Sequence, residues 1–212
     1  MSGSKINVAK QAIEYIKDKL HPEMILGIGT GSTVNFFIEE LKDLRNNFAG
    51  AVSSSDASSR LLSENGIEVF NLNDISEIAF YIDGADEVAP NKELIKGGGG
   101  AHTREKIVAS AAKEFICIVD DSKIVTKLGA FPLPVEVIPE SRSLVARRIV
   151  SMGGIPEYRA GFTTDQGNQI LDVKEIDISD PKELETLLNT IPGVVDNGIF
   201  AFNKPSVVLV SK

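Results

Sequence analysis

The chain has 212 residues, of which 42% are hydrophobic and 25% are charged, as in an ordinary soluble globular protein. A formal net charge of −8 and a pI near 4.9 disfavour binding to nucleic acids or to anionic membranes, and no Lys/Arg cluster offsets that charge. The single cysteine, Cys117, excludes an internal disulfide and lies in an apolar run that predicts a buried thiol. Neither a signal-peptide pattern nor an apolar stretch of membrane-spanning length is present, so we expect a cytoplasmic protein.

The first part of the chain alternates predicted helices with short, buried strands. Apolar residues at helical spacing end near Leu20, and Ser32 can cap a second helix. Strands are predicted at 24–28, 49–52, 68–70, 78–82 and 115–119, with further helices from Ala57 to Asn65 and from Thr103 to Ala112. Such alternation predicts a mostly parallel, Rossmann-like sheet that is covered on both faces and binds ligands at the carboxyl ends of its strands.

After Gly129 the pattern changes to that of a smaller α+β domain. Its predicted elements are a strand at 135–138, a helix capped by Ser141, a hairpin around 165–168, a helix opened by Asp180 and Pro181, and a strand from Val194 to Phe202. We place the last apolar segment, 207–210, back on the large sheet. The predicted domains are therefore a large α/β domain, residues 1–129 plus 205–212, and a small α+β domain, residues 130–204.

A glycine-rich loop, Gly-Ile-Gly-Thr-Gly-Ser-Thr at 27–33, joins the first strand to the second helix. Its backbone amides and the helix dipole favour an anion such as a phosphate, and Thr30, Ser32 and Thr33 add hydroxyl donors. The spacing matches neither a Walker A loop nor the dinucleotide pattern, which has a glycine in place of Ser32. Two alternatives remain: a tight turn without a ligand, and a nicotinamide cofactor whose ribose hydroxyl would bind Asp56.

Two acidic residues, Asp83 and Asp86, follow the strand at 78–82, where an open α/β sheet binds its ligands. They could perform acid–base chemistry, hold a magnesium ion together with substrate phosphates, or belong to a solvated turn.

Lys96 precedes four consecutive glycines, 97–100, which lose much conformational entropy on folding without packing in return. Close approach to a ligand would explain them, because their amides and the Lys96 ammonium could stabilise an oxyanion. Glu105, in the first turn of the following helix, is then a candidate general base, although a capping or dipole role is the common alternative.

His102 is interpreted as structural or surface, since the other histidine, His21, lies at no metal-ligand spacing from it. Lys123 follows another strand and is either an anion contact or an ordinary exposed lysine.

Seven motifs occur together in this chain: GIGTGST at 27–33, AVSSSDAS at 51–58, YIDGADE at 81–87, IKGGGG with TREKI at 95–107, FICIVDDSK at 115–123, FPLPVEVIP at 131–139 and GGIPEYR at 153–159. In this order and spacing they resemble the A-type ribose-5-phosphate isomerases along essentially the whole chain. The resemblance implies a Rossmann-like domain with a smaller α+β domain, homodimers or tetramers, and no metal or organic cofactor. It also implies the interconversion of D-ribose 5-phosphate and D-ribulose 5-phosphate in the non-oxidative pentose phosphate pathway.

Carried over by residue, the resemblance makes Glu105 the base that moves a proton between carbons one and two through a cis-enediolate. Asp83 would assist ring opening, Asp86 and Lys96 would hold and polarise the sugar hydroxyls, and amides around Gly98 and Gly99 would stabilise the enediolate oxygen. The implied substrate-binding residues are Lys5, Thr30, Gly31, Ser32, Thr33, Asp83, Gly84, Ala85, Asp86, Lys96, Gly97, Gly98, Gly99 and Lys123. Gly100 and His102 stand where some relatives have alanine and leucine, and neither change removes an implied catalytic group.

Two other functions fit parts of the pattern. A sugar-phosphate sensor without catalysis could use the same fold, but it should lack Glu105 and carry a DNA-binding domain. An oxidoreductase that uses a nicotinamide cofactor depends on the first glycine-rich loop and Asp56 alone.

Overall fold

The protein is described here by a computed structural model that covers residues 2–212. Internal contacts divide it into two compact units. The first unit runs to Gly84 and adds Arg104–Lys123 and Pro205–Lys212, and the second consists of Ala85–Thr103 and Ile124–Lys204. This division gives residues 85–103 to the second unit, whereas the boundary that we predicted from the sequence groups them with the large domain. That boundary stays a prediction about folding domains.

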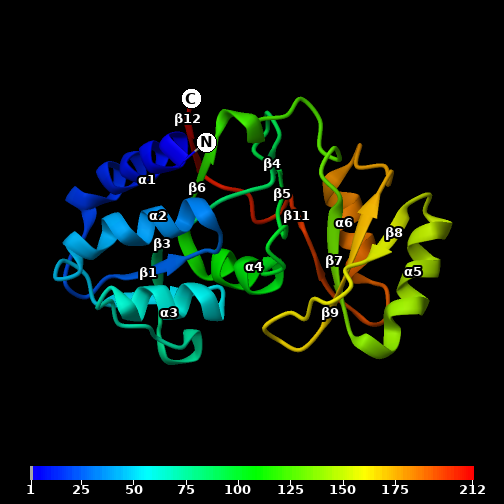
Figure 1. The fold of residues 1–212 in the computed structure, drawn as a ribbon, viewed down its shortest axis with the longest axis horizontal. Coiled ribbons are helices and arrows are strands. Elements are labelled where there is room, and N and C mark those ends of the chain that lie inside the picture. The colour runs from blue at the N-terminus through cyan, green and yellow to red at the C-terminus, as the bar shows by residue number, and fades with distance from the viewer. Residues whose placement is uncertain (1) are drawn as a thin grey trace. The chain divides into compact units, whose positions relative to one another are not determined.

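The first unit contains a five-stranded, wholly parallel sheet in the order β12-β6-β3-β1-β2 (Figure 1). Its strands are β1 (Ile25–Ile28), β2 (Gly50–Ser53), β3 (Ile78–Asp83), β6 (Ala112–Asp120) and β12 (Val207–Ser211). Its helices are α1 (Ser2–Ile16), α2 (Ser32–Leu41), α3 (Asp56–Glu64) and α4 (His102–Ala111), of which α4 begins two residues before the unit resumes. Four 3₁₀ turns follow elements of this unit, at Lys17–Lys19, Lys42–Leu44, Leu72–Asp74 and Asp121–Lys123. This confirms the predicted Rossmann-like parallel sheet.

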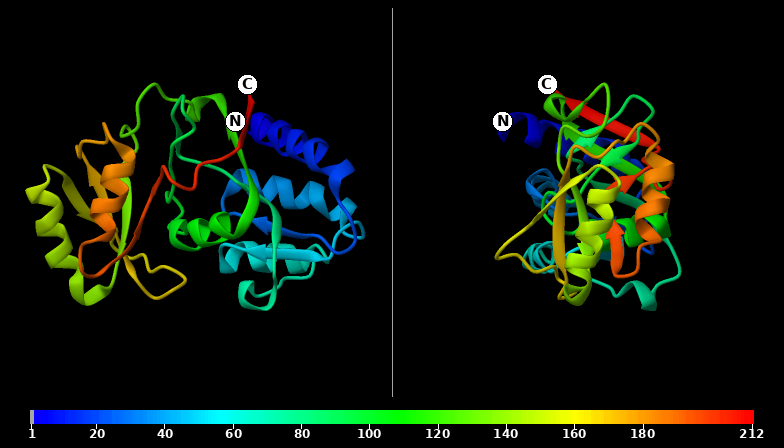
Figure 2. Two further views of the ribbon diagram at one scale, coloured as in Figure 1. Left: turned by 180° about the vertical axis from the view of Figure 1, so that it is seen from behind. Right: turned by 90° about the vertical axis from the view of Figure 1, so that its right-hand side faces the viewer.

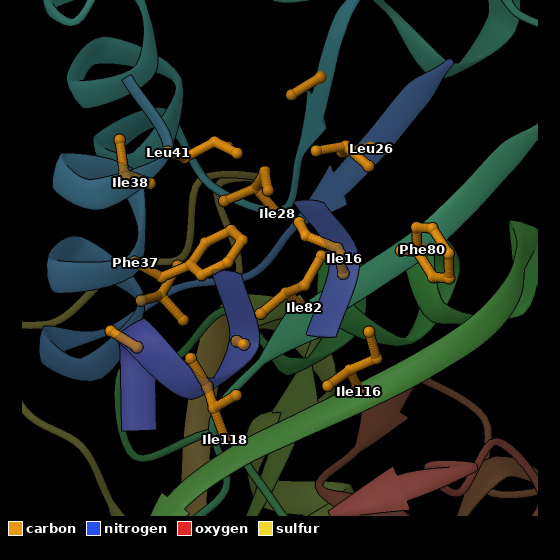
Figure 3. Close-up of a cluster of buried hydrophobic side chains, with 14 of the residues drawn as sticks. Ile16, Leu26, Ile28, Phe37, Ile38, Leu41, Phe80, Ile82, Ile116 and Ile118 are labelled. Atoms are coloured by element: carbon orange, nitrogen blue, oxygen red, sulfur yellow. The ribbon is translucent and has the colours of Figure 1, made fainter. Parts of the chain in front are cut away.

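Apolar side chains of α1 and α2 pack on one face of this sheet (Figure 3). Ile16 of α1 and Phe37 of α2 meet strand residues such as Ile28 and Ile82, all fully buried. Burying each such side chain contributes about 1.5–3 kcal/mol. The packed residues repeat every three to four positions in the helices and every two in the strands, because those are the periods at which side chains return to one face.

The opposite face packs against α4, and Gly27 allows the close approach. A Cβ added at Gly27 would lie 2.9 Å from Cδ2 of Tyr81 and 2.9 Å from Cγ1 of Val108 in α4. The start of α1 and the end of β12 lie together at one edge of the unit (Figure 2), where Ser211 donates a hydrogen bond to the carbonyl of Ser4. The placement of segment 207–210 on the large sheet is confirmed, because β12 pairs in parallel with β6.

The second unit contains a four-stranded antiparallel sheet in the order β10-β7-β9-β8 and a three-stranded sheet in the order β11-β5-β4. The four-stranded sheet consists of β7 (Leu133–Val137), β8 (Ile155–Tyr158), β9 (Gln169–Lys174) and β10 (Val194–Asn197). The helices of this unit are α5 (Arg142–Ser151), which follows a 3₁₀ turn at Pro139–Ser141, and α6 (Pro181–Asn189). The three-stranded sheet consists of β4 (Glu87–Val88), β5 (Leu94–Ile95) and β11 (Ile199–Phe200). Apolar residues of α5, α6 and both sheets form one core, so the predicted smaller α+β component is confirmed.

Two predicted strands are wrong in extent. Residues 68–70 form only an isolated bridge between Val69 and Ala51. The segment from Val194 to Phe202 is broken at Gly198 into β10 and β11, which belong to different sheets. Gly198 donates to the carbonyl of Pro134 and accepts from the amide of Lys96, and a Cβ there would lie 2.2 Å from the Lys96 carbonyl oxygen. These close backbone contacts turn the chain from one sheet to the other.

One predicted helix cap is wrong. Gly31, with φ of 121°, is the N-cap of α2, and Ser32 is already its first helical residue. Ser141 is the N-cap residue of α5, as predicted, but its side chain makes no capping hydrogen bond, and its hydroxyl donates to the carbonyls of Ile138 and Gly193 instead. Asp180 does cap α6, since its carboxylate accepts from the amide of Glu183 at 3.0 Å.

Candidate active site

The carboxyl ends of β1, β3 and β6 gather the predicted site residues of the first unit, because these three strands are parallel neighbours. The 29–33 loop follows β1, Asp83 ends β3, and Lys123 lies in the 3₁₀ turn after β6. Helix α4 leads directly into the start of β6, so its N-terminal turn lies at the same edge of the sheet. Glu105 is in that turn.

Asp83 is fully buried and joins the end of β3 to the glycine-rich loop. Its Oδ1 accepts hydrogen bonds from the amides of Thr30 at 3.1 Å and Gly84 at 2.7 Å. Its Oδ2 accepts one from the hydroxyl of Tyr81. A Cβ at Gly29 would lie 2.0 Å from Cγ of Asp83, so only glycine leaves room for this carboxylate.

Tyr81 connects Asp83 to Glu105 electrostatically. Burial raises the pKa of the Tyr81 hydroxyl well above 10.0, and the negative charges of Asp83 and Glu105 raise it further. The side chain of Ser54 hydrogen-bonds Tyr81 and also Oγ1 of Thr30 at 2.8 Å. Glu105 itself is only 4% exposed. The first unit thus holds two buried carboxylates around one neutral phenol.

The N-terminus of α2 has the features of an anion-binding site. Its first-turn amides have no partner within the helix, and the helix dipole places positive partial charge there. Nζ of Lys5, on α1, donates to Oγ of Ser32 at 2.7 Å, although the two residues lie 27 positions apart. The resemblance alone suggested Lys5, and the structure places it beside this loop. Lys123 is half-buried in the 3₁₀ turn after β6, and β3 separates β6 from β1 in the sheet. Thr33 is in the first turn of α2.

In the second unit, the glycine loop after β5 has a defined conformation. Gly97 and Gly100 have φ of 106° and 76°, which side-chain-bearing residues rarely adopt, and the Gly100 amide donates to the Gly97 carbonyl. The Gly98 amide donates to Oδ2 of Asp86 at 2.8 Å. Lys96 is buried, and its Nζ lies 5.5 Å from the ring centroid of Phe200. In this unit the carboxylate of Asp86 is therefore hydrogen-bonded to the glycine loop. Ala85, also a predicted binding residue, is the first residue of the unit and follows Gly84.

Several residues at these sites were missed in the sequence. Tyr81 could have been found, because residues i and i+2 of a strand share a face and Asp83 is two positions later. No sequence pattern pointed to Glu136. It is fully buried in β7 and accepts hydrogen bonds from Thr103, Thr164, Gln166 and Asn168.

Thr103 is the second residue of α4, so the carboxylate of Glu136 holds the start of the helix that carries Glu105. His102, predicted to be structural or on the surface, is fully buried with Nε2 3.4 Å from the carbonyl of Asp196.

Residues 2–212 contain no cluster of three or more His, Cys, Asp or Glu side chains arranged to hold a metal ion. Their helices include none that is both long and apolar enough to span a membrane. Cys117 is fully buried, as predicted.

The chain is similar to known proteins over its full length. The sequence profile of the family described as ribose 5-phosphate isomerase A (phosphoriboisomerase A) matches residues 50–212. A protein of Legionella pneumophila (strain Corby) called ribose-5-phosphate isomerase A is 56% identical over 211 residues, which cover 100% of this chain and 96% of the relative. A relative of the same name from Mannheimia succiniciproducens is 57% identical over 203 residues, 95% of this chain and 91% of the relative.

Solved structures give the same result. The crystal structure of ribose 5 phosphate isomerase A from Neisseria gonorrhoeae has a TM-score of 0.93 and 48% identity, and the match covers 99% of this chain and 94% of the other. A D-ribose-5-phosphate isomerase in complex with phospho-erythronic acid has a TM-score of 0.90 and 38% identity, covering 98% and 93%. Together with the parallel sheet and its buried carboxylates, these likenesses define an α/β enzyme of the isomerase class. The chain belongs to the ribose 5-phosphate isomerase A family.

Proposed function

We propose that this protein interconverts D-ribose 5-phosphate and D-ribulose 5-phosphate, with Glu105 as the proton-transfer base. Membership of the isomerase family and the names of relatives that match the whole chain support the substrate. A relative's complex with phospho-erythronic acid, a phosphorylated sugar acid, supports the same substrate class. The observation that carries the proposal is the position of Glu105, buried in the first turn of α4 at the carboxyl edge of the sheet.

In the proposed reaction, Glu105 removes the proton from carbon two of the open-chain aldose. The electron pair of that bond forms the carbon one to carbon two double bond of a cis-enediolate, and the carbonyl oxygen on carbon one takes the negative charge. Glu105 then returns the proton to carbon one, a proton moves from the oxygen on carbon two to that on carbon one, and the ketose results. This shift needs one base and one polarised carbonyl, and no redox agent.

The remaining groups bind and polarise the substrate in this proposal. Asp83 assists ring opening, Asp86 and Lys96 hold the sugar hydroxyls, and the amides of Gly98 and Gly99 stabilise the enediolate oxygen. The proposed substrate-binding residues further include Lys5, Thr30, Gly31, Ser32, Thr33, Gly84, Ala85, Gly97 and Lys123.

We also propose a homodimer or tetramer that acts in the cytoplasm, in the non-oxidative pentose phosphate pathway, without metal or organic cofactor. The resemblance to the family supports the oligomeric state, the pathway and the absence of a metal or organic cofactor.

The direct test is to mix the purified protein with ribose 5-phosphate in EDTA and to follow the appearance of ketose. We expect turnover that survives exhaustive chelation. Loss of activity on chelation, with recovery on adding Mg²⁺ or Mn²⁺, would reassign Asp83 and Asp86 as metal ligands. Binding of ribose 5-phosphate without turnover would support a sensor instead, and a fluorescence change on titration with a nicotinamide cofactor would support an oxidoreductase.

A further inference from the structure

Arg159 and Asp172 form a two-pronged ion pair in the second unit. Arg159 directly follows β8, and Asp172 lies on the adjacent antiparallel strand β9. Nε of Arg159 donates to Oδ2 of Asp172 at 2.8 Å, and Nη2 donates to Oδ1 at 2.5 Å. The side chains are 18% and 23% exposed. A bidentate pair of this kind holds the guanidinium plane in one orientation.

The same guanidinium also binds the glycine loop. Nη1 of Arg159 donates to the carbonyl of Gly98 at 3.2 Å, and Nη2 donates to the carbonyl of Gly97 at 3.2 Å. Two successive peptide carbonyls are therefore directed at one side chain that is 61 to 62 positions away in the sequence.

The direction of these carbonyls determines the direction of two amides. In a planar trans peptide the C=O and the following N–H point in opposite directions. The Gly98 amide consequently points away from Arg159, as its 2.8 Å hydrogen bond to Asp86 shows. By the same geometry the Gly99 amide points away from Arg159.

Glycine peptides need such an external restraint. Glycine adopts positive and negative φ about equally readily, so a run of four glycines does not select one orientation of its peptide planes. Phe162 adds a second restraint: its ring lies 5.3 Å from the Arg159 guanidinium, and a Cβ at Gly100 would be 2.3 Å from its Cζ. Arg159 is thus part of a packed support behind the loop.

We propose that Arg159, held by Asp172, is a positioning residue that orients the Gly99 amide as an oxyanion donor of the isomerisation. This inference rests on the proposed function, in which amides around Gly98 and Gly99 stabilise the enediolate; the Gly98 amide itself donates to Asp86. Without Arg159 the peptide planes could rotate, and a carbonyl oxygen could then face the developing negative charge. Transition-state stabilisation would decrease more than substrate binding, because the phosphate and the sugar hydroxyls are bound by other groups.

The test compares Arg159→Lys and Asp172→Asn with Lys174→Met. Lysine keeps the charge of Arg159, but its three N–H donors lack the planar fork and cannot make the four hydrogen bonds that the guanidinium makes to Asp172 and the two carbonyls. Lys174→Met is the matched control, because it removes the exposed ion pair with Glu157 across the same strands β8 and β9 at 2.8 Å without touching the loop. We expect kcat to fall about 100-fold in Arg159→Lys, with KM for ribose 5-phosphate nearly unchanged. Asp172→Asn should reduce kcat by a smaller factor, and the control should match the wild type.

Binding of phospho-erythronic acid gives a readout that does not depend on turnover. Its carboxylate carries negative charge at the end of a phosphorylated sugar chain, so its affinity should fall in Arg159→Lys and stay unchanged in Lys174→Met. Thermal unfolding identifies any variant that has lost its fold. If Arg159→Lys does not fold, kcat and the affinity for phospho-erythronic acid are compared between Asp172→Asn and Lys174→Met instead.

The inference is overturned if kcat of Arg159→Lys equals that of Lys174→Met, or if KM alone rises, which would make Arg159 a substrate contact. A failure of the proposed function is distinguishable, because the wild-type enzyme would then not convert ribose 5-phosphate.

Discussion

The hydroxyl of Tyr81 donates a hydrogen bond to the carboxylate of Asp83, two residues later on the buried strand β3. Both side chains project from the same face of the strand, opposite to Phe80 and Ile82, which pack in the core. The other carboxylate oxygen of Asp83 is held by backbone amides. Tyr81 therefore provides a side-chain donor that helps to orient this carboxylate.

Tyr81→Phe should destabilise the protein and slow the reaction. Losing a hydrogen bond to a charged, buried acceptor lowers the free energy of unfolding by about 1.5–3 kcal/mol, which urea denaturation can measure. We expect kcat to fall at least about tenfold because Asp83 loses its orientation. Tyr15→Phe is the control: Tyr15 donates to Glu114 at 2.6 Å in a partly buried site away from these carboxylates. It should retain wild-type kcat, and equal kcat in both variants would remove Tyr81 from the site.

The raised pKa of Tyr81 adds a pH dependence to the same comparison. An acid whose pKa is higher in the folded state than its ordinary 10.0 contributes stability below pH 10 and loses that contribution as the pH rises further. The difference in free energy of unfolding between wild type and Tyr81→Phe should therefore narrow between pH 9 and pH 11. A constant difference would show that Tyr81 ionises at the same pH in both states.

Glu105→Gln separates proton transfer from helix capping. Glutamine keeps the shape and can fill a capping role, but it lacks the basic oxygen. Loss of a general base typically costs 10²- to 10⁴-fold, so kcat should fall by at least that much while KM and folding stay near wild type. Glu77→Gln, which removes a carboxylate from the exposed ion pair with Lys113, should leave kcat unchanged.

Hydrogen exchange gives a second measurement on Glu105. One carboxylate that carries a single proton on one face of the substrate should leave some solvent deuterium at carbon two of ribose 5-phosphate formed in D₂O. Glu105→Gln should abolish that incorporation. If Glu105→Gln retains more than about a tenth of wild-type kcat, the loss is too small for a missing general base. Glu105 would then be structural, and Asp83 and His102 would be tested as the base.

Removing the groups around the N-terminus of α2 should weaken phosphate binding. Charge-assisted hydrogen bonds contribute about 1.5–3 kcal/mol, so Lys5→Ala, Ser32→Ala and Lys123→Ala should each raise KM roughly tenfold or more. Inhibition by inorganic phosphate should weaken in parallel. Lys10→Ala is the matched control, because Lys10 lies on the same helix as Lys5 and pairs only loosely with Glu40 at 3.8 Å. An unchanged KM with a collapsed kcat would place the phosphate elsewhere.

Gly99→Ala tests whether the glycine loop contacts the substrate. Among the described residues no atom lies within 4 Å of a Cβ added at Gly99, and its φ is not positive, so the variant should fold with wild-type stability. A methyl group beside the proposed oxyanion donor should nevertheless obstruct the substrate and lower kcat/KM. Wild-type kcat/KM in this variant would argue against close approach of a ligand at Gly99.

Local patterns were enough to predict most of the fold. Helical and strand periodicities place apolar side chains on one face of an element, and this property depends on near neighbours in the sequence. For that reason the parallel sheet, the Asp180 cap and the buried Cys117 were predicted correctly. The predictions for 68–70 and for Val194 to Phe202 were wrong because apolar composition does not reveal whether a segment finds a partner strand. That outcome depends on the rest of the sheet.

The candidate site divides in the same way. Motifs of adjacent residues identified Asp83, the 97–100 loop and Glu105 as candidates, and the predicted parallel sheet implied that the loops after its own strands share an edge. No local pattern could pair Lys5 with Ser32, 27 positions away, or Arg159 with the carbonyl of Gly98, 61 positions away. Such hydrogen bonds require donor and acceptor within about 3 Å and in alignment. Only the folded chain determines which distant side chains meet that condition.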